Sequence, residues 1–406
     1  MPKNQVQAMR AASAVLLSGV LGLTACTRDY TVAYVYATAS SNGANGVINE
    51  YAVSYQSGAL VALPGSPVST GVNPVSIETT SNGLFAYVIN QDDSTVQMFA
   101  VGSGGQLSSK GTYATGTKPT ALALDAANKF LYVTYTYQPG YSASNTGPGG
   151  ISIFPINADN TLGTPTNLNI GNGPAGIVTT NFNNYVYVID AESAVGSASP
   201  YGVLLAFSEN ATSGALTAIG STKISTDASG RTVASGYGAG TVPSSIAVDP
   251  QARFLYITDR STNQLYGNVV LAGGLIQPMQ NSPFATGLLP VNVTVDPRGK
   301  FLYVANYNSN TVTAYVIDQS TGATSGTATA NSTTVGTGPS CISIEPALGI
   351  YMYTANNLDN TTTGLKLTAN NGTVAATQNS PYPASGAPTC IATVANGSHA
   401  SQVINP

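Results

Sequence analysis

The stretch Asp296-Pro297-Arg298-Gly299-Lys300-Phe301-Leu302-Tyr303-Val304 carries the strongest structural signal in the chain, because versions of it recur along most of the length. The tripeptide Phe-Leu-Tyr is repeated unchanged at 130–132 and 254–256. Every copy holds a tyrosine within an apolar run: Tyr34, Tyr87, Tyr132, Tyr187, Tyr256, Tyr303 and Tyr353. A second apolar run, opened by a proline, recurs between them: Pro74, Pro119, Pro174, Pro243, Pro290, Pro339 and Pro388. Successive tyrosines are 45 to 69 residues apart, and a repeat near this length with several short strands is typical of a β-propeller.

The two ends of this array complement each other. Tyr34 has no proline run before it, and Pro388 has no tyrosine run after it. We therefore predict an all-β fold over residues 31–396, a seven-bladed β-propeller with four antiparallel strands per blade. The N-terminal and C-terminal strands pair in one blade and close the ring, which removes the open sheet edges of a linear array. The recurring tyrosines are expected to pack between blades.

Composition excludes several classes of function. Only 7% of the residues are charged, the formal net charge is −4 and the pI is about 4.9. Such a chain lacks the basic stripe of a nucleic-acid-binding protein, so no nucleic-acid partner is expected. No phosphate loop, Gly-x-Ser-x-Gly motif or metal-ligand spacing occurs. The sequence therefore predicts no cofactor and no metal site.

The N-terminus has the features of an export signal. Lys3 and Arg10 precede and flank an apolar run, Ala11–Leu21, that is too short to span a bilayer. It ends in Leu23-Thr24-Ala25-Cys26, which resembles the lipobox of bacterial lipoproteins. This resemblance implies a signal peptide at 1–25, a lipid on Cys26, a tether at 26–30 and membrane anchoring in the bacterial cell envelope; 397–406 would form a C-terminal tail. In the alternative, the segment is an ordinary cleaved signal peptide, and Cys26 carries no lipid.

Two further cysteines, Cys341 and Cys390, lie two residues after the prolines of adjacent blades. Equivalent positions point the same way around a ring, so one thiol should face its neighbour while the other faces away. A disulfide requires close Cα atoms and converging Cβ vectors. We therefore expect no disulfide, although an oxidising compartment would permit one.

The repeats resemble a known family. Tyr-Val-Ile-Asn at 87–90, Tyr-Val-Ala-Asn at 303–306 and Tyr-Thr-Ala-Asn at 353–356 are similar to YVTN-type propellers, and the 296–304 stretch resembles the seven-bladed lactonase family, which includes 6-phosphogluconolactonase-like enzymes. The resemblance covers roughly 30–395 and implies lactone chemistry with His, Arg and Glu near the channel mouth. This chain departs from that pattern, because its one histidine, His399, lies in the tail and leaves the ring without a base of near-neutral unperturbed pKa.

Three long insertions, at 136–149, 191–201 and 225–242, are expected on the same face of the ring. Long loops on a rigid scaffold often carry binding residues. We expect ligand-binding side chains among Lys118, Tyr137, Tyr141, Tyr201 and Tyr237, and catalytic candidates among Arg231, Arg260, Glu192 and Asp259. The cations would bind a carboxylate or phosphate, and the tyrosines would stack on sugars or hold the loops down. Asn90, Asp190, Asp259, Asn306 and Asn356, which end equivalent strands, are interpreted as turn residues and not as Ca²⁺ ligands.

Two functional hypotheses follow. In the first, a cell-envelope lipoprotein presents the long-loop face as a binding scaffold to a glycan, a small carboxylate or a protein partner. In the alternative, the chain is an exported lactonase-family hydrolase acting on a sugar lactone or a related lactone. Arg231, Arg260 and Lys118 would then bind acid groups or the oxyanion, and Glu192 or Asp259 would act as the base. The sequence leaves open whether the protein is an enzyme.

Overall fold

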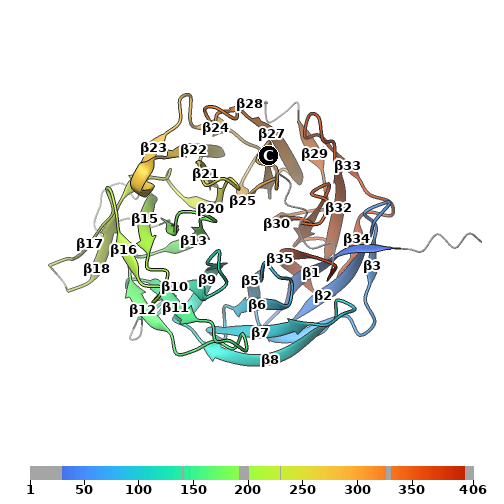
Figure 1. Ribbon diagram of the computed structural model, residues 1–406, viewed down its shortest axis with the longest axis horizontal. Coiled ribbons are helices and arrows are strands. Elements are labelled where there is room, and N and C mark those ends of the chain that lie inside the picture. Colours follow the sequence, from blue (N-terminus) through green and yellow to red (C-terminus); the bar gives the residue numbers. More distant parts are fainter. Residues whose placement is uncertain are drawn as a thin grey trace, which may run out of the picture. The chain divides into compact units, whose positions relative to one another are not determined.

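The computed structural model describes residues 30–138, 141–145, 147–191, 201–228, 230–325 and 331–397. The chain divides into two units, Met1–Tyr30 and Thr31–Pro406. The second unit forms a seven-bladed β-propeller, as predicted, in which each blade is an antiparallel sheet around a central channel (Figure 1). Its strands run from Thr31 to Ala395.

The first four blades are built from the following strands, given from the channel outward. Blade 1 contains β35 (Ala387–Ala395), β1 (Thr31–Ser41), β2 (Ala44–Ser54), β3 (Leu60–Ala62) and β4 (Val68–Val72); blade 2 contains β5 (Pro74–Thr79), β6 (Phe85–Asn90), β7 (Thr95–Val101) and β8 (Leu107–Ala114); blade 3 contains β9 (Thr117–Leu124), β10 (Phe130–Tyr137), β11 (Gly150–Pro155) and β12 (Thr166–Asn169); blade 4 contains β13 (Pro174–Thr179), β14 (Tyr185–Asp190), β15 (Val203–Glu209), β16 (Leu216–Ala218) and β19 (Tyr237–Gly238). A hairpin of β17 (Lys223–Thr226) and β18 (Thr232–Ser235) projects from the outer side of blade 4 (Figure 1).

The remaining three blades follow the same plan. Blade 5 contains β20 (Pro243–Val248), β21 (Phe254–Asp259), β22 (Gln264–Val270), β23 (Ile276–Pro278) and β24 (Phe284–Ala285), with a short 3-10 helix η1 (Ala272–Gly274); blade 6 contains β25 (Pro290–Val295), β26 (Phe301–Asn306), β27 (Thr311–Ile317), β28 (Thr324–Ser325) and β29 (Ser332–Thr334); blade 7 contains β30 (Pro339–Ile344), β31 (Tyr351–Asn356), β32 (Thr361–Leu367), β33 (Val374–Ala376) and β34 (Tyr382–Pro383). In five blades the outermost strand is split into two short pieces that pair with opposite ends of the third strand.

Blade 1 contains strands from both ends of the propeller. The C-terminal strand β35 is its innermost strand and pairs antiparallel with β1, with Tyr36 opposite Ala392 and Thr38 opposite Cys390. This register corrects one detail of the repeat. The tyrosine equivalent to Tyr87 or Tyr303 in blade 1 is Tyr36 and not Tyr34, because β1 is longer at its start than the equivalent strands.

The recurring tyrosines join each blade to the next one. Each is buried and donates its hydroxyl to a backbone carbonyl in the turn that leads to the outer strand of the following blade: Tyr36 to Gly105 (2.6 Å), Tyr87 to Asn160 (2.9 Å), Tyr132 to Gly214 (3.0 Å), Tyr187 to Gly274 (3.1 Å), Tyr256 to Gly322 (2.7 Å), Tyr303 to Gly372 (3.0 Å) and Tyr353 to Gly58 (2.8 Å). All seven acceptor residues have positive φ, which explains why six are glycine. The tyrosines therefore pack between blades, as expected, and also pair their buried hydroxyls.

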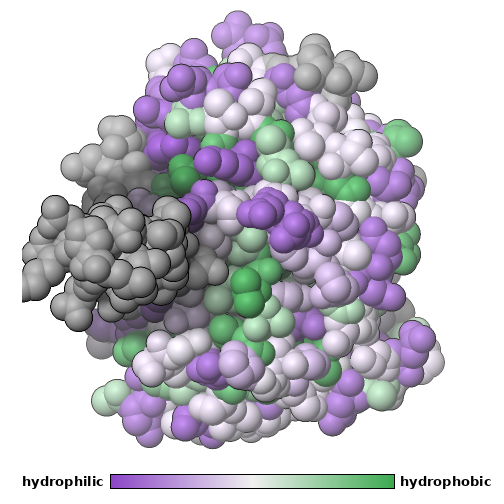
Figure 2. All heavy atoms as spheres, turned by 90° about the vertical axis from the view of Figure 1, so that its right-hand side faces the viewer, coloured by the Kyte–Doolittle hydropathy of each residue, from purple (hydrophilic) through white to green (hydrophobic). Residues whose placement is uncertain are grey.

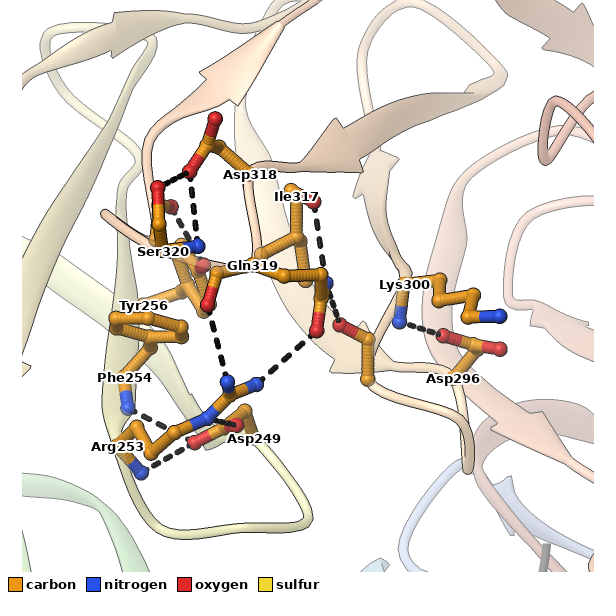
Figure 3. A network of polar contacts seen from close by, with 12 residues as sticks. Asp249, Arg253, Phe254, Tyr256, Asp296, Lys300, Ile317, Asp318, Gln319 and Ser320 are labelled. Carbon is orange, nitrogen blue, oxygen red and sulfur yellow. Dashed lines mark hydrogen bonds and ion pairs between the residues drawn. The ribbon is translucent and has the colours of Figure 1, made fainter. Parts of the chain in front are cut away.

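Carboxylates organise the turns between the first and second strands of several blades. Asp249 accepts the amides of Arg253 (2.5 Å) and Phe254 (2.8 Å) and pairs with the Arg253 guanidinium (3.0 Å). That guanidinium also donates to the carbonyl and side-chain oxygens of Gln319 in blade 6 (3.1 and 3.2 Å; Figure 3). Asp296 plays the same part for Lys300 and Phe301. These turns therefore hold their own loop and the neighbouring blade together.

Cys341 of β30 and Cys390 of β35 form a disulfide, with Cα atoms 4.8 Å apart. The prediction of two free thiols was wrong because the inner strands of adjacent blades approach more closely than the repeat pattern suggests. Side chains at this position reach the backbone amide of the neighbouring inner strand, as Asn292 does for the amide of Ile342 (3.0 Å). The bond ties the ring-closing strand to blade 7.

Candidate functional site

The central channel is lined by the first strand of every blade. One cavity of the channel has a volume of about 470 Å³, and most of its lining residues are serine, threonine, alanine, valine or isoleucine. Several hydroxyls are held in place, because Thr120 donates to the carbonyl of Pro174 (2.6 Å) and Ser244 to that of Pro290 (2.7 Å). These bonds link the inner strands of adjacent blades. Most of the described residues of the wall are uncharged.

Glu78 of β5 is the exception. The equivalent residues in the other blades, counted from the repeat proline, are Ala123, Val178, Ala247, Thr294, Ser343 and Ala392. Among the described residues that line the channel cavities, Glu78 and Asp125 are the ionisable side chains. Asp125 is engaged in its own turn, where it accepts the amides of Lys129 and Phe130 (both 2.6 Å).

The carboxylate of Glu78 makes no hydrogen bond or ion pair with any residue that the structure describes, and it is accessible from the channel. The side chain of Glu78 is exposed to the channel, but the surrounding wall limits its hydration, and this desolvation raises the pKa of Glu78 to about 7. A carboxylate exchanging its proton near neutral pH is suited to act as a general base. The sequence analysis missed Glu78, although a charged residue at an otherwise small or apolar repeat position was a usable signal.

Arg260 lies at the channel mouth on the face where the third insertion was expected. It lines a hollow of about 280 Å³, and this hollow shares Thr120, Ala175, Ser244 and Val291 with the channel cavity. Its guanidinium makes no hydrogen bond or ion pair with the described residues. Arg260 is thus an available cation at the entrance, whereas Lys118 is exposed and paired with Asp92 (3.0 Å).

Asp259, a candidate base, is fully buried beneath the same turn. It accepts the backbone amides of Thr241 (2.6 Å) and Ser261 (2.9 Å) and the hydroxyl of Ser261 (2.8 Å). Burial alone would raise its pKa, but these hydrogen bonds hold the pKa of Asp259 below its usual value. Such an arrangement favours the turn role that the sequence suggested for this position.

The other described candidates do not line the hollow that contains Arg260. Arg231 lies in the β17–β18 hairpin and pairs with Asp227 (2.8 Å), and Tyr237 in β19 accepts a hydrogen bond from the amide of Ser221 (3.2 Å). The 225–242 connector, expected to be a loop, therefore contains the end of β17 and the strands β18 and β19, on the outer side of blade 4 (Figure 1). Tyr137 ends β10, and the amide of Tyr141 donates to the carbonyl of Gln138 (3.0 Å).

Some predictions fall on residues outside those described. Glu192, most of the 191–201 insertion, Cys26 and His399 belong to this group. Tyr201 is described and is largely exposed near the start of β15. None of the described residues forms a helix with the length and hydrophobicity needed to cross a bilayer. Within the described ranges there is also no cluster of three or more His, Cys, Asp or Glu that would hold a metal ion.

The outer surface offers no extended apolar area on the side seen in Figure 2. Hydrophobic residues there form small separate groups among hydrophilic and neutral ones. The channel and its mouth combine a carboxylate and a guanidinium that have no partners among the described residues.

Comparison with solved structures finds the same architecture in several proteins. A putative 6-phosphogluconolactonase from Bacteroides uniformis has a TM-score of 0.70 at 18% identity, covering 90% of this chain and 100% of that one. The Bacteroides fragilis counterpart has a TM-score of 0.68 at 17% identity, with 91% and 99% covered. The periplasmic gluconolactonase of Pseudomonas aeruginosa has a TM-score of 0.68 at 16% identity, with 90% and 99% covered. At these identities the likeness establishes the fold alone.

No curated protein sequence matches the chain. The family model described as "Lactonase, 7-bladed beta-propeller" matches residues 33–179 and 171–344, which together make up more than half of the sequence. The chain therefore belongs to the lactonase family of seven-bladed β-propellers.

Proposed function

We propose that this protein hydrolyses a lactone bound in the central channel, with Glu78 as the general base. The observation that carries the proposal is the carboxylate of Glu78, which lines the channel, has no partner among the described residues and has a pKa raised to about 7. Membership of the lactonase family supports the reaction class. Both points favour a hydrolase over the binding scaffold. Glu78 would serve as the general base, a role for which the ring has no histidine.

The proposed hydrolysis uses Glu78 and one water molecule. Glu78 takes a proton from a water molecule in the channel, and the water oxygen attacks the lactone carbonyl. The tetrahedral intermediate collapses with cleavage of the ring C–O bond, and the protonated Glu78 returns its proton to the leaving alkoxide. The product is the open hydroxy acid, and the carboxylate is regenerated. General base catalysis of this kind contributes about 10²–10⁴-fold.

Arg260 attracts an acidic substituent of the substrate to the mouth. A guanidinium without a protein partner binds carboxylate or phosphate through paired, charge-assisted hydrogen bonds. The hollow that it lines opens into the channel through shared residues such as Thr120 and Ser244. Removing this cation is expected to raise KM for acidic lactones more than it lowers kcat, because Arg260 lies away from the reacting carbonyl.

A lactone panel tests the proposal. The purified protein is assayed on glucono-1,5-lactone, 6-phosphogluconolactone and simple γ-lactones, beside the Glu78→Gln variant. We expect kcat/KM on the best substrate to fall about 100-fold or more in Glu78→Gln. Asp159→Asn, which changes an exposed carboxylate in a surface turn, serves as the matched control and should keep full activity. The proposal fails if no lactone is turned over or if Glu78→Gln stays active.

We also propose that the chain is exported and lipid-anchored through Cys26, as the Leu23–Cys26 sequence suggests. The prediction concerns residues outside the described part of the chain. Expression in a bacterial host followed by detergent phase separation tests it. The wild-type protein should enter the detergent phase, and Cys26→Ala should remain in the aqueous phase. Equal partitioning of both would contradict lipidation.

A further inference from the structure

A groove crosses the outer part of the seam between blades 4 and 5. It has a volume of about 400 Å³, and its walls include Tyr201 and Gly238 from blade 4 and Tyr266, Asn268 and Ser282 from blade 5. We call it the seam groove. It shares no lining residue with the channel cavity, so an inference about it stands apart from the proposed hydrolase.

The seam groove exists where one blade departs from the repeat. In every blade, the third strand places one residue opposite the residue that precedes the recurring tyrosine. In six blades that residue is a large, buried side chain that fills the seam: Tyr51, Phe99, Phe154, Phe207, Tyr315 and Leu365. In blade 5 the same position, opposite Leu255, is Asn268. The smaller, polar side chain leaves space that the other seams do not have.

Asn268 is itself unsatisfied. Only 3% of its surface is exposed, and its side-chain Nδ2 has no hydrogen-bond partner among the described residues. Buried amide groups in folded proteins nearly always have a partner, because leaving one unpaired is unfavourable. Asn268 is thus a polar residue at a position that large side chains fill in the other blades, and its amide nitrogen lacks an acceptor. This combination indicates that the position serves a purpose other than packing.

The chemistry of the walls defines the ligand. No charged side chain is among the described residues that line the groove, so an ionic ligand would find no counter-charge there. Two tyrosine rings are present, and Tyr201 exposes 60% of its surface. Thr241 and Ser282 add hydroxyls, and a Cβ built on Gly238 would meet nothing within 4 Å, which leaves that wall open.

We propose that the seam groove binds a neutral saccharide unit. One face of a sugar ring is apolar and packs on tyrosine, while its hydroxyls accept and donate hydrogen bonds. One such hydroxyl accepts the hydrogen bond that the Asn268 Nδ2 lacks. A phosphate or carboxylate ligand would instead need the cations that the groove does not contain. The protein would thus hold a carbohydrate chain on its outer side, away from the channel.

The test uses the full chain and four disaccharides: cellobiose, maltose, lactose and N,N′-diacetylchitobiose. Binding is measured by saturation-transfer NMR and calorimetry. At least one sugar should bind, and its affinity should fall tenfold or more in both Tyr201→Ala and Asn268→Leu. Phe182→Ala removes another exposed aromatic (72% exposed) in a turn that does not line the groove, and should bind like the wild type.

Asn268→Leu also has a diagnostic effect on stability. It introduces the residue type that blade 7 carries at this position, so it should raise the melting temperature while it abolishes sugar binding. A merely structural Asn268 would not combine these two results. The proposal is overturned if none of the four sugars binds, or if Asn268→Leu binds sugar as the wild type does.

Discussion

Two sets of equivalent positions in this propeller have opposite characters. Between the blades, seven tyrosines make the same hydrogen bond to the same kind of turn, from Tyr36 to Tyr353. Along the channel, seven equivalent strands carry different side chains, including Glu78, Asn292 and the bonded Cys341 and Cys390. The first set joins each blade to the next, and the same residue type occupies all seven positions. The second set is free to vary, so the departures from the repeat mark the places where individual blades have separate tasks.

The largest effect on stability is expected from the disulfide. Its two cysteines depart from the repeat, and they have a structural role. The bond closes a loop of 49 residues, which corresponds to a stabilisation of about 4 kcal/mol in the chain-entropy model. The double variant Cys341→Ser/Cys390→Ser should lose that amount, measured by urea denaturation under oxidising conditions. The wild-type protein with reductant should behave like the variant. A loss below about 1 kcal/mol would show that the ring needs no covalent closure.

A turn carboxylate ranks second. Asp249→Ala leaves two amides without their acceptor and removes the ion pair that orients the Arg253 guanidinium toward Gln319. Unsatisfied buried groups cost about 1–3 kcal/mol each, and we expect a total loss of about 3 kcal/mol. Asp318→Ala, in an exposed turn of the neighbouring blade, is the matched control and should lose less than about 1 kcal/mol. Similar losses in the two variants would remove the special role of the buried turns.

A single seam tyrosine should matter less. Tyr256→Phe keeps the ring but removes the hydroxyl that donates to Gly322 (2.7 Å). Loss of one buried hydrogen bond is expected to cost about 1–2 kcal/mol. Tyr137→Phe, which alters a half-buried tyrosine outside the repeated set, should change stability by less than about 0.5 kcal/mol. Thermal denaturation of both variants, followed by circular dichroism, would reveal whether the seam bonds are as important as their repetition suggests.

The smallest effect concerns the pH dependence of stability at Glu78. Its folded pKa of about 7 lies above the ordinary value of 4.5, so the folded state binds the proton more tightly than the unfolded chain. The contribution of this group to stability is therefore greatest below about pH 4.5 and is lost as the pH rises through 7. Glu78→Gln should flatten the melting temperature between pH 5 and 8 and exceed the wild type at pH 8. An unchanged pH profile would contradict the raised pKa.

The architecture could be predicted from the sequence because each blade repeats its tyrosine and proline runs. The register of blade 1 could not, since Tyr34 and Tyr36 lie in the same apolar run and only the pairing of β1 with β35 distinguishes them. The β17–β18 hairpin was missed although Asp227 and Gly230 supply turn residues between alternating segments. The disulfide was not predicted because the sequence repeat does not reveal how closely the inner strands β30 and β35 approach each other.

The candidate site was predictable only in part. Arg260 was found from its place after a repeated strand, and the structure puts it at the channel mouth. Glu78 was not predicted because it lies within a short inner strand, where a single charged residue is a weaker signal than a long insertion. Asn268 has a signal of the same kind, an aromatic position occupied by an amide, but recognising it requires the strand register that aligns it with Phe207 and Tyr315.

The composition of blade 1 has a consequence for how the chain reaches its folded state. Thr38 and Thr389, which are hydrogen-bonded, lie 351 residues apart in the sequence. The inner edge of β1 therefore stays uncovered during synthesis or export until β35 follows. Contacts this distant form slowly, and an uncovered edge invites pairing with other chains. A nascent chain of this protein is thus vulnerable to aggregation until β35 has been made, and a truncation that removes β35 would make that vulnerable stage permanent.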